Sequence, residues 1–72
     1  MTINDDRFKW AGAALGTFML ATGTDIEDAL ADLLADLMHW ANQNHVDFDL
    51  ELQRGRDHYE VEIVEDAEEV TP

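Results

Sequence analysis

The chain has 72 residues, enough for one small domain, and its lack of cysteine excludes disulfides and thiolate metal sites. Its 17 acidic residues against 4 basic ones give a net charge of -13, which opposes binding to nucleic acid or anionic membranes and favours basic partners. A hydrophobic share of 46% predicts a folded protein. The lack of cysteine fits a reducing compartment, and we predict a cytoplasmic location. So short a chain needs close helix packing, self-association or a partner for stability.

The first predicted helix follows a loose arm of residues 1–5 and is capped by Asn4, Asp5 or Asp6. Gly23 is suited to end it. Residues 11–23 carry no charge, but this run is too short to span a bilayer, and the acids before it do not suit a secretion signal. The apolar residues recur at helical spacing: Phe8, Ala11, Gly12, Leu15, Phe18 and Met19.

The second predicted helix begins at a capping box, Thr24-x-x-Glu27, in which each side chain reaches a free backbone N–H. Acids in its first turn suit the helix dipole, and the helix should run to about Asn44. One broad apolar face predicts that this helix packs against others, with Trp40 at the edge of the face. That face consists of Ile26, Leu30, Leu33, Leu34, Leu37, Met38 and Ala41.

Residues 46–64 fit two structures. Apolar residues alternate with acids on both sides of residues 53–57, which is typical of a β-hairpin. A helix capped by Asp47 also fits, because Phe48, Leu52, Gly55, Tyr59 and Ile63 fall on one helical stripe. Periodicity alone slightly favours the hairpin. We predict a single domain over residues 1–64 and a disordered acidic tail over residues 65–72.

Three motifs resemble a family of small bacterial and phage-type proteins that has no assigned activity. They are DLLADLMHWA at residues 32–41, VDFD at residues 46–49 and HY at residues 58–59. The resemblance covers residues 25–62 and implies a helical last segment, although alanine is more usual in the family where Gly55 stands. We therefore predict an all-α fold of two long antiparallel helices and a third helix. The alternative is that the third element is a β-hairpin, which would give an α+β fold.

A fainter similarity links the second helix and residues 46–48 to the all-α nucleotide pyrophosphohydrolases. Those enzymes bind magnesium through an E-x-x-D pair. Asp36 matches the second acid of the pair, but Leu33 stands in the place of the first. A metal-dependent nucleotide hydrolase relic is accordingly a second alternative function.

An acidic stripe is the main candidate for a binding surface. Asp28, Asp32 and Asp36 lie four residues apart, with Asp25 beside them, and no Lys or Arg occurs between Trp10 and Gln53. Such a row can imitate backbone phosphates and occupy a basic groove that binds nucleic acid. Glu60 and Glu62 are the second candidates, in an acid-rich C-terminal segment. The alternative is a solvated helix face that only keeps the protein in solution.

A metal site is the next possibility. Asp36 and His39 are one helical turn apart, Asp32 lies on the same face, and His58 could approach from the third element. Two ligands on one helix do not make a site, and these histidines can simply offset nearby acids. Because serine is absent and no nucleophile or phosphate-loop motif occurs, we predict neither an enzyme nor a cofactor.

We expect more apolar residues than short helices can bury, and we therefore predict a homodimer interface that includes Trp10, Leu37 and Trp40. The sequence thus predicts a small acidic protein-binding module, an inhibitor of the anti-CRISPR or anti-restriction kind, whose partner is a basic protein surface. We expect no direct contact with nucleic acid and none with a membrane. The alternative is a homodimeric structural or adaptor protein.

Overall fold

The computed structural model describes the backbone of residues 3–70 and the side chains of residues 5–65. It contains three helices, α1 (Ile3–Thr22), α2 (Ile26–Gln43) and α3 (Phe48–Val70). No strand occurs between residues 3 and 70. The predicted all-α fold is confirmed, and the hairpin that periodicity favoured over residues 46–64 is wrong.

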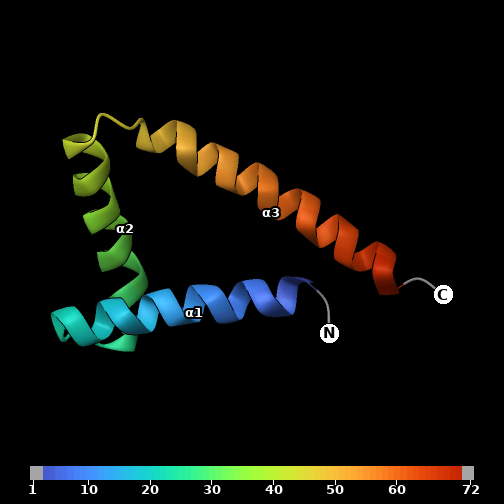
Figure 1. The fold of residues 1–72 in the computed structure, drawn as a ribbon, viewed down its shortest axis with the longest axis horizontal. Coiled ribbons are helices and arrows are strands. Elements are labelled where there is room, and N and C mark those ends of the chain that lie inside the picture. The colour runs from blue at the N-terminus through green and yellow to red at the C-terminus, as the bar shows by residue number, and fades with distance from the viewer. Residues whose placement is uncertain (1–2, 71–72) are drawn as a thin grey trace.

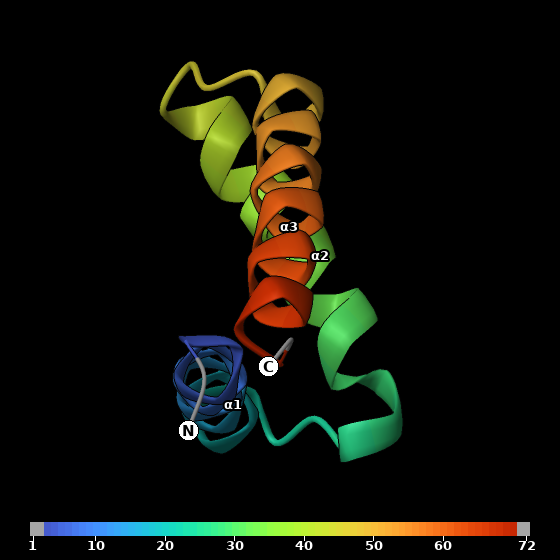
Figure 2. The same ribbon diagram turned by 90° about the vertical axis from the view of Figure 1, so that its right-hand side faces the viewer.

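The three helices form the sides of a triangle (Figure 1). α2 joins the other two at wide angles, and α3 runs back toward the beginning of α1 (Figure 1 and Figure 2). The Cα radius of gyration is 14.8 Å, whereas a compact domain of this length would have about 11 Å. The arrangement is therefore open for so short a chain.

α1 begins earlier than predicted. Residues 3–5 are already helical, so Asp5 and Asp6 lie in the first turn, where they suit the helix dipole, and do not cap the helix. Gly23 ends α1 as predicted, with a φ of 75° and an N–H that donates to the Met19 carbonyl at 2.8 Å. This left-handed conformation favours glycine because it has no Cβ.

The predicted capping box at the start of α2 does not form. The N-cap is Asp25, whose side chain makes no capping hydrogen bond, although its carbonyl accepts the Asp28 N–H at 3.0 Å. The Thr24 hydroxyl is instead hydrogen-bonded to the Thr22 hydroxyl at 2.9 Å. The Thr24 hydroxyl therefore bonds to the last residue of α1, and the N-terminus of α2 has no side-chain cap.

α2 ends in a Schellman motif. The Val46 N–H donates to the Ala41 carbonyl at 2.8 Å, and the His45 N–H donates to the Asn42 carbonyl at 3.4 Å. His45 has a φ of 57°, in the left-handed region that glycine usually occupies at this position. The Asn44 side-chain amide adds a bond to the Trp40 carbonyl at 2.9 Å. Together these bonds satisfy carbonyls that the helix end leaves free.

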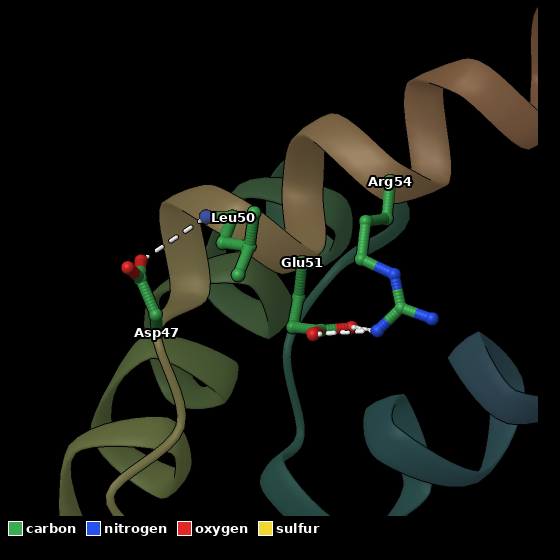
Figure 3. A network of polar contacts seen from close by, with 4 residues as sticks. All are labelled: Asp47, Leu50, Glu51 and Arg54. Atoms are coloured by element: carbon green, nitrogen blue, oxygen red, sulfur yellow. Dashed lines mark hydrogen bonds and ion pairs between the residues drawn. The ribbon is translucent and has the colours of Figure 1, made fainter.

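α3 begins as the helical alternative predicted, with Asp47 as its cap. The Asp47 Oδ1 accepts the Leu50 N–H at 3.1 Å, and one turn later Arg54 Nη1 donates to both carboxylate oxygens of Glu51 at 2.9 and 3.2 Å (Figure 3). The helix continues to Val70, past the domain boundary predicted at residue 64. Residues 71–72 of the predicted tail lie outside the described residues.

Among the side chains of residues 5–65, only Ala29 and Ala41 are buried. They lie near the two ends of α2, where the chain turns into the neighbouring helices. The chain exposes 5927 Å², compared with about 4,500 Å² for a compact monomer of the same mass. Large apolar side chains account for much of this surface, and Leu20 is 90% exposed. The single chain thus has helices but almost no core.

Candidate binding surfaces

The acidic row of α2, defined as Asp25, Asp28, Asp32 and Asp36, is exposed at every position. At about 100° and 1.5 Å per residue, the four carboxylates fall on one side of the helix, about 6 Å apart along the axis from Asp28 onward. Among the side chains of residues 5–65, none of the ion pairs involves this row. The structure therefore brings these predicted residues together as one uncompensated line of charge.

The spacing of the carboxylates in the acidic row determines how closely the row can imitate the phosphates of a nucleic-acid strand. One strand of B-DNA carries a charge about every 3.4 Å of axis, so carboxylates spaced by about 6 Å provide roughly half that density. A basic groove would thus gain fewer ion pairs from the row than from a nucleic-acid strand of equal length. Additional contacts, such as apolar ones, would have to supplement the row in a tight complex.

Glu60 and Glu62 do not extend the acidic row. Both lie in the second half of α3, at the end that is remote from α2 (Figure 1). Glu60 is exposed, whereas Glu62 is paired with Arg7 of α1 at 3.1 Å and its side chain is only 20% exposed. The ion pair links α1 to α3 and offsets the charge of Glu62, which leaves Glu60 as the better candidate of the two.

The residues predicted for self-association are all exposed: Trp10 by 62%, Leu37 by 42% and Trp40 by 58%. Trp10 belongs to α1, while the other two belong to the second half of α2, which leads into the corner with α3 (Figure 1). They accordingly lie on two separate sides of the triangle. A partner would have to reach both sides to cover all three.

Sequence reasoning did not identify an open apolar groove between α2 and α3. The groove has a volume of about 510 Å³, and Glu51 and Arg56 supply its charged lining. The helical stripe on residues 48–63 was the signal for one wall, but the other wall depends on how α2 meets α3. The apolar part of the lining, hereafter the α2/α3 groove, consists of Leu34, Leu37, Phe48, Leu52, Gly55 and Tyr59.

The ligands of the possible metal site are not brought together. In the part of the chain with described side chains, no three acidic or histidine residues lie close enough to hold a metal ion. The pairing of Asp32, Asp36 and His39 with His58 therefore does not occur. The structure also contains no helix, among its described residues, with the length and apolar character needed to cross a membrane.

Comparisons of the chain with family models, with curated proteins and with solved structures found no match. The resemblance to small bacterial and phage-type proteins consequently rests on the three quoted motifs alone. The two surfaces described above, one acidic and one apolar, are the basis for assigning a function.

Proposed function

We propose that this protein is a small acidic binding module that occupies a basic, nucleic-acid-binding surface of another protein through the acidic row of α2. The observation that carries this proposal is the exposure of four carboxylates on one side of one helix, without an ion pair to any described side chain. A fixed line of negative charge competes with backbone phosphates for the same lysines and arginines.

The energetic cost of the acidic row supports a binding role. Like charges four residues apart destabilise a helix by about 0.2–0.5 kcal/mol per pair, and Asp32 has such a neighbour on both sides. We expect Asp32→Asn to raise the free energy of unfolding by about 0.5 kcal/mol at low salt, and the gain to shrink as salt screens the charges. Carboxylates that destabilise their own helix in the free protein, but form ion pairs in a complex, are expected at a surface that contacts a basic partner.

An inhibitor is the form of this function that fits best. A protein of net charge -13 is steered toward a basic groove by long-range attraction, and it blocks that groove simply by occupying it. The resemblance to phage-type proteins suggests an anti-CRISPR or anti-restriction target in the cytoplasm. Catalysis is not needed for such a role.

The test compares two triple variants that remove equal charge. One neutralises the row (Asp28→Asn, Asp32→Asn, Asp36→Asn), and the matched control neutralises exposed acids of α3 (Asp49→Asn, Asp57→Asn, Glu65→Gln). A basic partner is first captured from lysate at low salt and identified. Its binding to labelled DNA or RNA is then measured with each variant as competitor.

We expect the native protein and the α3 control to displace the nucleic acid, and the row variant to displace it at least about 100-fold less well, as three charged contacts of about 1 kcal/mol each imply. Equal weakening by both variants would show that net charge alone matters. Undiminished competition by the row variant would rule out the acidic row as the contact.

A homodimeric structural or adaptor protein is the second candidate. The observation that favours it is the exposed apolar surface, including Trp40 and Leu37. In that case the protein would assemble with itself, and neutralising the acidic row would change no interaction. The same two triple variants distinguish the candidates, because only the first predicts that the row variant loses a partner.

A further inference from the structure

The single chain leaves a large apolar area uncovered. Its accessible surface of 5927 Å² exceeds the value for a compact monomer of this mass by about 1,400 Å². A standard protein interface takes about 800 Å² from each partner. The excess surface is therefore larger than the area that one partner of a standard interface contributes. Among the side chains of residues 5–65 only Ala29 and Ala41 are buried, which leaves little to offset the chain entropy that folding costs.

We propose that two copies of this chain form a reciprocal dimer in which the outer face of α1 of each copy lies in the α2/α3 groove of the other. The outer face of α1 is defined by Trp10, Ala13, Thr17 and Leu20, which share one side of the helix at steps of three and four residues. This inference does not depend on the proposed function, because it involves none of the acidic row.

The outer face of α1 has the properties of a surface that becomes buried. Trp10 is 62% and Leu20 is 90% exposed in the single chain. The one polar side chain of the face is already satisfied, because the Thr17 hydroxyl donates to the Ala13 carbonyl at 3.1 Å. A helix segment that is apolar on every side is stable in water only when other elements cover it.

The α2/α3 groove offers a matching surface. Five of the six residues that define it carry apolar or aromatic side chains, and the sixth is Gly55. A Cβ at Gly55 would meet no atom of its own chain within 4 Å, so nothing inside the chain requires glycine there. A glycine in a helix interior costs about 1 kcal/mol relative to alanine. The absence of a Cβ at Gly55 would allow a helix of a second copy to approach closely, which explains why glycine stands there.

Charge selects α1 as the occupant. Each copy has a net charge of -13, so a dimer must keep the acids of the two copies apart. Residues 11–24 form a charge-free stretch and can enter an acidic partner without repulsion. The acidic row also stays in solvent, because Asp32 lies roughly 150° around α2 from the groove residues Leu34 and Leu37.

Sedimentation velocity on matched glutamine variants tests the dimer. Leu20→Gln removes an apolar contact of the proposed interface, and Ala11→Gln places the same neutral side chain on an exposed position about half a turn away from Leu20. We expect the native protein and Ala11→Gln to sediment at twice the chain mass of 8.2 kDa. For Leu20→Gln we expect a dimer dissociation constant raised about 100-fold.

Loss of folding in Leu20→Gln alone would also support the dimer, because a side chain that is 90% exposed cannot hold a single chain together. Isotope-filtered NOEs in a mixed labelled dimer supply the second measurement, with contacts expected from the Leu20 methyls of one copy to Leu52 and Tyr59 of the other. A monomeric native protein, an unweakened Leu20→Gln dimer, or NOEs that place α1 elsewhere would each overturn the proposal.

Discussion

The two corners of the triangle use different chemistry for the same task. At the α1–α2 corner the left-handed residue is Gly23, and the N-cap Asp25 makes no side-chain bond. At the α2–α3 corner the left-handed residue is His45, and the N-cap Asp47 bonds to the Leu50 N–H. The first corner is conformationally relaxed but poorly capped, whereas the second is well capped but strained.

The difference shows that short-range hydrogen bonds determine where each helix ends but do not bury the apolar side chains that the helices expose. The α2–α3 corner has the more complete set of local bonds, and it also carries the uncovered α2/α3 groove. Its stability should therefore respond to apolar truncation more strongly than to loss of any cap.

The largest effect is expected at Leu52 in the groove. Leu52→Ala should lower the free energy of unfolding by about 2 kcal/mol if a second copy covers the groove. Leu50→Ala is the matched control, because Leu50 is 56% exposed, against 49% for Leu52, and lies outside the groove. The control should stay within about 0.5 kcal/mol of the native protein. Urea unfolding at equal protein concentrations measures both, and equal small losses would indicate an uncovered groove.

The second largest effect is expected at the N-caps of α2 and α3, whose loss should lower the free energy of unfolding by different amounts. Asp47→Ala should cost about 1 kcal/mol, because it removes the bond to the Leu50 N–H. Asp25→Ala should cost less than half as much, because Asp25 offers only a charge near the helix N-terminus. Thermal unfolding followed by circular dichroism compares them. A larger loss at Asp25 would reverse the comparison of the corners.

The two left-handed residues should respond in opposite directions. His45→Gly should stabilise the protein by roughly 1 kcal/mol, since glycine adopts a φ of 57° without a Cβ clash. Gly23→Ala should destabilise it by a similar amount, because the strain at a φ of 75° does not depend on the open space around the residue. Chemical denaturation of both variants checks the signs. A destabilised His45→Gly would mean that the imidazole itself contributes to the corner.

The smallest effect is expected at the ion pair between Arg7 of α1 and Glu62 of α3. Arg7→Gln removes the ion pair with Glu62, which is partly exposed, and should cost at most about 0.5 kcal/mol. High salt should reduce the difference from the native protein. A cost that persists in high salt would show that Arg7 acts through packing of its aliphatic part rather than through charge.

Salt separates the two proposed interactions. Binding through the acidic row to a basic surface should weaken as salt rises, because opposite charges are screened. Association of two copies that each carry -13 should strengthen, because screening reduces their mutual repulsion. The outer face of α1 and the acidic row lie on different helices, so a dimer would present two such rows to a partner.

The candidate site was only partly predictable from the sequence. The spacing of Asp28, Asp32 and Asp36 was sufficient to place them on one helix face, because helical geometry is local. The pairing of Glu62 with Arg7 was not predictable, because those residues lie 55 positions apart and meet only when α3 returns to α1. For the same reason one wall of the α2/α3 groove was visible as a stripe and the other was not.

The sequence by itself determined that the chain is acidic and has no cysteine. It also determined the second helix, the end of the first helix at Gly23 and, for a helical last segment, the use of Asp47 as a cap. Each of these depends on composition or on residues within one turn of each other. Only the tertiary structure decided that residues 48–70 form one helix and that the three helices enclose so little core. Alternation and helical spacing overlap in residues 46–64, and the angles between helices depend on contacts between distant residues, which no local pattern contains.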